Sequence, residues 1–282
     1  MVVYTNTSEK ISILRRLQLT ELEILNEVVR ICEKNKLQYF LIGGTLLGAI
    51  RHKGFIPWDD DLDIAMPRED YEKFILSSKN ELSKEYWLHC SGTDPDYWLP
   101  FAKVRKKGTV FDEYNSRNIV SDKGIYIDIF PLDNAKKEKS LFQSIQALLC
   151  KKLSPIILWK RGFFEGKPKI AINIILKIIK NKSLMELSTY QQKIMSIYKK
   201  SNSKYFVNLG SNYNYIKQTI PKNKYYPPVK VEFEGKLYNA PNDWDYILNR
   251  IYGDYMKLPP VEKRITHNPF RIRFEDGQEI TF

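Results

Sequence analysis

Residues 43–74 read GGTLLGAIRHKGFIPWDDDLDIAMPREDYEKF and contain two motifs that together predict a phosphate site beside a metal site. The first letters predict a turn at Gly43 and Gly44, followed by a short helix over residues 45–52. Such a turn can hold a phosphate, because small residues and Thr45 let backbone N–H groups approach its oxygens and the helix N-terminus adds a positive partial charge. Glycine is common in strand-to-helix turns, so a phosphate site needs support from a second motif.

The second motif is the acidic segment WDDDLDI at residues 58–64. Residues 61–66 predict a strand, in which Asp59, Asp61 and Asp63 share one face if the strand extends that far. Like charges this close oppose each other's ionisation, and a divalent cation relieves the repulsion. Mg²⁺ prefers carboxylate oxygens and bridges to substrate phosphates. The alternative is an exposed acidic loop that caps the next helix.

A third aspartate is expected on a neighbouring strand, GIYIDIFPLD at residues 124–133. Alternation places Asp128 on the same face as Tyr126 and Phe130, opposite a face of isoleucines. An aspartate in so apolar a strand is costly unless it is paired or binds a metal ion. The alternative is a carboxylate satisfied by a buried arginine or a backbone amide. Asp133 is expected in a loop or at a helix cap.

The remaining pattern predicts an α+β fold, a mixed sheet flanked by helices. Further helices are predicted over residues 20–34, 67–78, 141–158, 170–200 and 243–252, and further strands over residues 37–42, 86–90, 101–105 and 124–130. The first helix would begin at a capping box of Thr20 and Glu23. Residues 231–238 alternate like a hairpin, and residues 257–282 look irregular.

These motifs closely resemble those of the LicD-type phosphocholine transferases, whose eukaryotic relatives are fukutin and the fukutin-related protein. Residues 43–74 resemble the family signature, residues 124–133 its second block, and residues 251–267 (IYGDYMKLPPVEKRITH) its closing block. The resemblance implies a nucleotidyltransferase fold. We therefore expect a catalytic core at 1–134, a basic helical region at 135–224, and a segment at 225–282 that packs back on the core and completes the active site.

The resemblance also implies a donor and an acceptor. In bacterial members the donor is CDP-choline and the acceptor is a sugar hydroxyl of lipopolysaccharide, teichoic acid or a related glycan, here expected on a polyprenyl lipid. Other CDP-linked polyol phosphates, such as ribitol or glycerol phosphate, remain open. The hydroxyl would attack the β-phosphorus and release CMP. Two Mg²⁺ ions, with Mn²⁺ as an alternative, would be held by Asp61, Asp63 and Asp128, with Asp59 as an outer ligand.

Several other residues are candidates for binding the donor. Those expected near its phosphates are Gly43, Gly44, Thr45, Arg51, Lys103, Arg105, Lys263, Arg264 and His267. A quaternary ammonium needs aromatic faces around it, and the candidates are Trp58, Tyr97, Trp98 and Tyr126. The alternative is a solvated surface for the cations and a core position for the aromatic residues. We also expect Asp128 to accept the proton of the acceptor hydroxyl.

The net charge of +12 is concentrated in one region. Residues 136–204 hold 16 Lys and Arg against 3 Asp and Glu, a balance of +13 that leaves about −1 for the rest. By charge alone, such a surface suits an anionic membrane, a phosphorylated carrier or nucleic acid. Of these three partners, nucleic acid is the one that we do not expect. The alternative is a basic solvated face on core helices. The polar N-terminus and three scattered cysteines favour a cytoplasmic protein, at or near the inner face of the cell membrane.

Three other classes of protein compete with this interpretation. A true nucleotidyltransferase would use the same metal site but release pyrophosphate. A glycosyltransferase could use the DxD motif for a nucleotide sugar, although the glycine turn and the third aspartate argue against it. A non-catalytic protein could bind nucleic acid or membrane through the basic region, with salt-sensitive binding and no metal requirement.

Overall fold

The computed structural model describes residues 7–114, 122–137, 140–164, 166, 168–264, 266 and 269–282. Its central sheet has the strand order β1 (Phe40–Leu41), β2 (Asp63–Pro67), β6 (Tyr126–Ala135), β4 (Ala102–Lys106) and β3 (Tyr86–His89). Two further strands, β7 (Tyr205–Val207) and β8 (Thr219–Pro221), extend it from β6. β2 and β6 are parallel and the other pairs are antiparallel. The predicted α+β fold with a mixed sheet is confirmed.

Two helices cover one face of this sheet, α1 (Thr7–Lys34) and α3 (Arg68–Glu81). Strand residues such as Val104, Ile127 and Ile129 are fully buried there. The predicted start of the first helix at Thr20 is wrong. Its apolar spacing continues upstream through buried Ile13 and Leu17, and the Thr20 hydroxyl donates to the Arg16 carbonyl at 2.9 Å instead of capping the helix.

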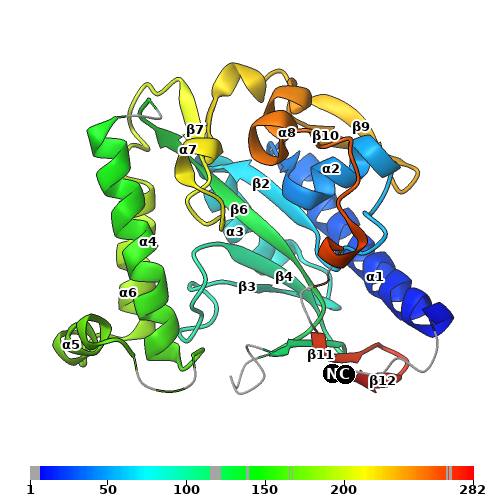
Figure 1. Cartoon of the computed structure of the whole chain (residues 1–282), viewed down its shortest axis with the longest axis horizontal. Helices are drawn as coiled ribbons and strands as arrows, with labels where there is room; N and C mark the ends of the chain where they lie inside the picture. The colour runs from blue at the N-terminus through cyan, green and yellow to red at the C-terminus, as the bar shows by residue number, and fades with distance from the viewer. Residues whose placement is uncertain are drawn as a thin grey trace.

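A second group of elements lies at the β1 end of the sheet (Figure 1). It contains α2 (Gly43–His52), the hairpin of β9 (Val229–Phe233) and β10 (Lys236–Ala240), and α8 (Trp244–Tyr252). α2 packs against β2, β9 and α8, and β10 packs against β1. The predicted hairpin and the predicted C-terminal helix are confirmed, and Asp243 caps the helix by accepting from the Tyr246 amide at 3.1 Å.

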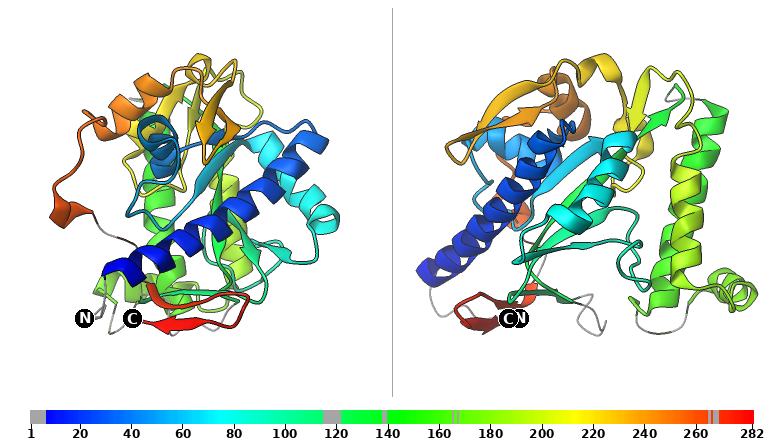
Figure 2. Two further views of the ribbon diagram at one scale, coloured as in Figure 1. Left: turned by 90° about the vertical axis from the view of Figure 1, so that its right-hand side faces the viewer. Right: turned by 180° about the vertical axis from the view of Figure 1, so that it is seen from behind.

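The basic region forms a pair of helices beside the sheet, on the left of Figure 1 and the right of Figure 2's rear view. α4 (Leu141–Arg161) packs against α6 (Leu184–Met195), and α5 (Ile170–Ile178) lies between them in sequence. The helix predicted over residues 170–200 is interrupted, because Ser183 and Glu186 form a capping box that starts α6 anew. Short helical turns follow at α7 (Tyr215–Gln218) and η2 (Lys222–Lys224).

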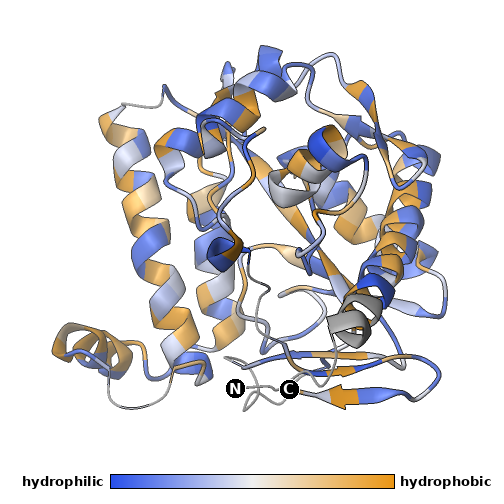
Figure 3. Cartoon of the chain, turned by 45° about the vertical axis from the view of Figure 1, so that its right-hand side comes forward, coloured by the Kyte–Doolittle hydropathy of each residue, from blue (hydrophilic) through white to orange (hydrophobic). Residues whose placement is uncertain are grey.

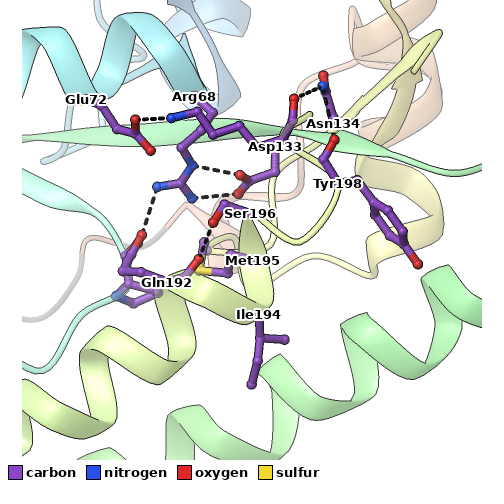
Figure 4. Close-up of polar contacts among 12 residues, drawn as sticks. Arg68, Glu72, Asp133, Asn134, Gln192, Ile194, Met195, Ser196 and Tyr198 are labelled. Atoms are coloured by element: carbon purple, nitrogen blue, oxygen red, sulfur yellow. Dashed lines mark hydrogen bonds and ion pairs between the residues drawn. The ribbon is translucent and has the colours of Figure 1, made fainter. Parts of the chain in front are cut away.

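A buried ion pair attaches these helices to the central sheet and its covering helix α3 (Figure 4). Arg68 of α3 donates from Nε and Nη2 to both carboxylate oxygens of Asp133, each at 2.7 Å. Its Nη1 donates to Gln192 of α6 at 2.8 Å. The expectation that Asp133 lies in a loop or cap is wrong, because β6 runs on to Ala135 and buries this carboxylate fully.

The C-terminal segment adds a small separate sheet near both described ends of the chain (Figure 2). After η3 (Val261–Lys263), β11 (Pro269–Arg273) pairs with β12 (Glu279–Thr281) and with β5 (Val110–Glu113). The expectation of irregular structure after residue 257 is therefore wrong for these strands. Their pairing with β5 joins segments more than a hundred residues apart, which a local pattern does not reveal. The proposed three-part division of the chain stays a prediction.

Candidate functional site

One row of polar side chains crosses four neighbouring strands. His89 on β3 is paired in register with Lys103 on β4, Lys103 with Asp128 on β6, and Asp128 with Asp63 on β2. Side chains of directly paired residues project from the same face of a sheet. The two aspartates that the sequence placed on separate strands are therefore neighbours on one face, opposite the apolar face that α1 and α3 cover.

The carboxylates of β2 and of the preceding loop lie against the glycine turn. A Cβ atom added to Gly43, whose φ is +57°, would stand 3.1 Å from Asp63 Oδ2. One added to Gly44 would stand 2.6 Å from Asp59 Oδ2. The Asp63 amide donates to the Thr45 hydroxyl at 2.8 Å, which fastens the strand to the helix. The turn thus leaves room for the acids directly at the N-terminus of α2, where negative charge is favoured.

The strand begins two residues later than predicted, at Asp63. Asp59 and Asp61 therefore reach the site from a loop rather than by strand alternation. This loop is held by the Asp59 amide, which donates to the Ile56 carbonyl at 2.9 Å, and by Gln18 of α1, which donates to the Asp59 carbonyl at 2.9 Å. Asp60, which lies between these two residues in the loop, is buried.

The acids are close enough to perturb each other's ionisation. Burial raises the pKa of Asp63 well above its usual value, and the charges of Asp61, Asp128 and Asp59 raise it further. Burial also raises the pKa of Asp128, while Lys103 opposes this rise with its ammonium 2.6 Å from Asp128 Oδ1. Lys103 is only 5% exposed. A cation is therefore already paired with the acid cluster, and it comes from the chain itself.

The oxygen atoms at this site are the kind of ligand that a divalent cation requires. Carboxylate oxygens from two strands and a loop converge beside backbone amides, and Mg²⁺ favours oxygen ligands of this kind. Among the described residues, however, no three Asp, Glu, His or Cys side chains are arranged to enclose an ion as they stand. Lys103 donates a hydrogen bond to Asp128, one of the carboxylates that would coordinate the ion. The assignment of Asp59, Asp61, Asp63 and Asp128 as metal ligands stays a prediction.

A further acid, Glu21 of α1, was not identified from the sequence. It is 2% exposed, and its Oε2 atom has no hydrogen-bond partner. Burial, and then the charges of Asp61 and its neighbours, raise the pKa of Glu21 well above its usual value. The signal was present in the helix pattern, because Glu21 lies at a buried position between Leu17 and Leu25.

Two of the predicted cations, Arg51 and Arg264, lie near the acids of this site. Burial and the nearby charge of Arg264 lower the pKa of Arg51, while Asp59 raises it. The guanidinium carbon of Arg264 lies 4.8 Å from the centre of the Trp58 ring. Arg51 Nη1 donates to the Tyr255 carbonyl at 2.6 Å. Arg51, Arg264 and Trp58 thus meet beside Asp59, whereas Lys263 is exposed and His267 lies outside the described residues.

Two tyrosines, Tyr252 near Gly43 and its neighbour Tyr213, were not predicted from the sequence. The hydroxyl of Tyr252 in α8 would stand 3.9 Å from a Cβ atom on Gly43. Burial and a hydrogen-bonded neighbour, Tyr213, raise its pKa, and Asp63 and Asp59 add to the rise. The two rings meet edge to face at 5.8 Å. Tyr252 lies in the block that resembles the family's closing motif, so its place in that block was the available signal.

The other predicted donor-binding residues are occupied by contacts within the chain. Arg105 donates from Nε to His89 Nδ1 at 2.9 Å and from Nη1 to the Gly124 carbonyl at 2.7 Å. Lys103 Nζ lies 3.3 Å from the centre of the Tyr126 ring, and the Tyr126 hydroxyl donates to Glu113. One face of Tyr126 therefore already carries a cation.

Tyr97 and Trp98 lie in the loop between β3 and β4, and this loop packs against the helical pair. Tyr97 is 1% exposed, and its hydroxyl has no hydrogen-bond partner. Trp98 packs with Ile157, Leu184 and Leu187, residues of α4 and α6. Neither ring presents an open face, so of the four aromatic candidates Trp58 is the one beside both the acids and the arginines. The choline-binding assignments stay predictions.

Comparisons with known proteins find a relative that covers most of the chain. Residues 36–146 match the family model described as LicD/FKTN/FKRP, nucleotidyltransferase domain. The chain is 32% identical over 270 residues to the lipopolysaccharide cholinephosphotransferase LicD of Haemophilus influenzae, covering 90% of this chain and 96% of that protein. It is 46% identical over 48 residues to the human ribitol 5-phosphate transferase FKRP, which is 17% of this chain and 10% of that protein.

Proposed function

The chain belongs to the LicD family and is a transferase of phosphorus-containing groups, and we propose that it moves phosphocholine from CDP-choline to a hydroxyl of a lipid-linked cell-surface glycan. Likeness to a cholinephosphotransferase along nearly its whole length supports the head group. The observation that carries the proposal is the in-register pair of Asp63 and Asp128 facing the glycine turn at α2. The reaction belongs at the cytoplasmic face of the membrane that holds the acceptor.

Different residues of the chain would bind the metal ion and the phosphates of the donor. Asp61, Asp63 and Asp128 would hold Mg²⁺, or Mn²⁺ in its place, with Asp59 as an outer ligand. When bound, the metal neutralises the diphosphate. The backbone amides of Gly43 and Gly44, at the N-terminus of α2, would donate hydrogen bonds to a phosphate oxygen.

Transfer requires a new phosphorus–oxygen bond and the loss of an old one. The acceptor oxygen attacks the β-phosphorus as the bond to CMP breaks, and the hydroxyl proton passes to a carboxylate. Asp128 suits this role, because burial raises its pKa and makes it a better proton acceptor, while Lys103 opposes this rise by favouring the carboxylate form. Arg51 and Arg264 lie where they can bind the negative charge of the donor.

Trp58 is the aromatic residue best placed for the head group. A guanidinium already lies 4.8 Å from its ring centre, and the same attraction binds a quaternary ammonium. Ribitol or glycerol phosphate carries no cation and would lack this cation–π attraction. The alternative of such a polyol phosphate is supported by the likeness to ribitol 5-phosphate transferases, which covers only 48 residues.

The donor can be identified by its products. The purified chain is incubated with CDP-choline, CDP-ribitol or CDP-glycerol, with a lipid-linked glycan fraction as acceptor, with and without Mg²⁺. We expect Mg²⁺-dependent release of CMP from CDP-choline and label from choline in the glycan. CMP release from CDP-ribitol alone would favour the polyol donor, and pyrophosphate release from CTP with phosphocholine would favour a true nucleotidyltransferase.

A substitution tests the metal site within the same assay. Asp61→Asn removes one anionic oxygen from the cluster, and we expect CMP release to fall by more than about a thousandfold. The matched control is Asp276→Asn, which changes an aspartate that is 59% exposed on the C-terminal sheet and keeps its turn hydrogen bond. Near-normal activity of Asp61→Asn would refute its assignment.

A further inference from the structure

The outer face of α4 exposes apolar side chains that nothing in the described chain covers. Five large residues, each between 45% and 70% exposed, share that face: Leu141, Phe142, Ile145, Leu148 and Leu149. Their spacing is that of one helical stripe. The opposite face is packed, since Gln146 donates to the carbonyls of Ile194 and Met195, both at 2.8 Å. The apolar stripe therefore lies on a different face of α4 from the one that packs against α6.

The neighbouring helix α5 is apolar and has no buried residue. Ile170 and Ile178 are 82% and 77% exposed, and Ile174 lies between them on the same stripe. Figures 1 and 2 show α5 projecting from the end of the helical pair, away from the central sheet, and Figure 3 shows it as predominantly hydrophobic. A nine-residue helix of this composition gains little by facing water.

The charges around these stripes are almost all positive. Lys151 and Lys152 are exposed directly after the α4 stripe, and Lys177 is exposed on α5. Among the described residues from 140 to 204, the single carboxylate side chain is Glu186, which pairs with Lys182 at 3.0 Å. A second copy of this face would be repelled by such an excess. An anionic lipid surface would be attracted to it while its acyl boundary takes up the apolar side chains.

We propose that the outer face of α4 together with α5 docks on an anionic lipid bilayer and lies in its interface. By length and composition alone α4 could also cross a bilayer. Its polar anchors oppose that placement, because Gln143 accepts from the Lys136 amide at 2.8 Å and Gln146 is bonded to α6. Docking needs neither donor nor metal, so it goes beyond the proposed function.

Sedimentation with vesicles tests the proposal on the full chain. We expect the chain to sediment with vesicles that contain phosphatidylglycerol and much less with phosphatidylcholine alone. The double substitution Ile174→Asp and Ile178→Asp should weaken binding by about tenfold or more, because it places charge in the inserted stripe. Lys151→Glu with Lys152→Glu should weaken it in a salt-dependent way. Leu237→Asp changes a residue that is 64% exposed on β10 and should leave binding unchanged.

The outcomes separate docking from chemistry. Circular dichroism shows whether each variant is folded, and CMP release with a water-soluble acceptor should be unchanged in the α5 variant. Equal sedimentation of wild type and the α5 variant would overturn the proposal. So would a wild-type dimer in light scattering that becomes monomeric in the α5 variant, because the stripe would then be an interface between copies.

Discussion

For single residues, the sequence predicted the position of a side chain best where residues alternate regularly along a strand. Alternation along a strand correctly placed Asp63 and Asp128 on one face, since their strands pair in register. The positions of Asp59 and Asp61 depend on a loop and on Gln18 of a distant helix, which no alternation describes. Glu21 was missed for a related reason, because its environment consists of acids brought from other segments.

His89 shows how this polar row affects stability. Burial, and then the charge of Arg105, lower its pKa to about 4, and Asp94 opposes the change from 2.8 Å. Arg105 donates to Nδ1, so Nε2 carries the proton and donates to Asp94. The folded chain thus holds a neutral imidazole whose protonation would break this arrangement.

We therefore predict that His89 makes stability fall in acid. Its folded pKa lies below the unfolded value of about 6.5, so the unfolded chain binds more protons between these values. The contribution is fully present above pH 6.5 and should decrease by about 2 kcal/mol between pH 7 and pH 5. Urea unfolding at both pH values measures it. The carboxylates with raised pKa act in the opposite direction, so the wild type is compared with His89→Gln, and equal slopes would contradict the prediction.

At the scale of elements, local signals identified α2, α3, the β9–β10 hairpin and α8, because turns, caps and periodicity lie within each segment. They failed for β5, β11 and β12, which are short and exist only through pairing with one another. The two glycines that begin α2 combine both situations. Their letters predict a turn, but the reason for two glycines appears only when the carboxylates beside them are seen.

Gly44→Ala tests what that turn is for. The added Cβ would stand 2.6 Å from Asp59 Oδ2, and a carboxylate end can rotate away at little cost. Alanine also favours a helix by up to about 1 kcal/mol over glycine. We expect the melting temperature to change little and CMP release to fall by about tenfold or more, since Asp59 leaves its place.

The matched control for this variant is Gly92→Ala. There the nearest atom, Cys90 Sγ, lies 3.7 Å from the added Cβ, an ordinary contact. Magnesium titration by calorimetry gives a second reading, which should show weaker binding in Gly44→Ala only. Full activity together with unchanged magnesium affinity would show that the second glycine serves the backbone alone.

At the scale of the whole molecule, the sequence indicated a basic helical region but not its attachment. The attachment depends on Arg68 and Asp133, 65 residues apart, and on Gln192, a further 59 residues along. No local pattern joins residues at such separations. Asn134 strengthens the same junction by donating to the Lys199 carbonyl at 2.9 Å. The helices that we propose for the membrane are thus fastened to the strand that carries Asp128.

Removal of one member of this buried pair should destabilise the junction strongly. Arg68 is 6% exposed and Asp133 is fully buried, so Arg68→Ala leaves an uncompensated carboxylate in the interior. Such losses typically reach about 3–5 kcal/mol. We expect a fall of this size in the free energy of unfolding from urea titration, with earlier proteolytic cleavage between α4 and α6.

Two comparisons distinguish this charge effect from a loss of packing. The double variant Arg68→Met with Asp133→Leu replaces both charges by apolar groups and should recover most of the stability, because neither charge is then left unpaired. Lys73→Ala, on the same helix, removes a lysine that is 63% exposed and 3.7 Å from Asp70, and should cost under about 1 kcal/mol. If the double variant is no more stable than Arg68→Ala, the junction depends on shape and on Gln192 rather than on the pairing of charges.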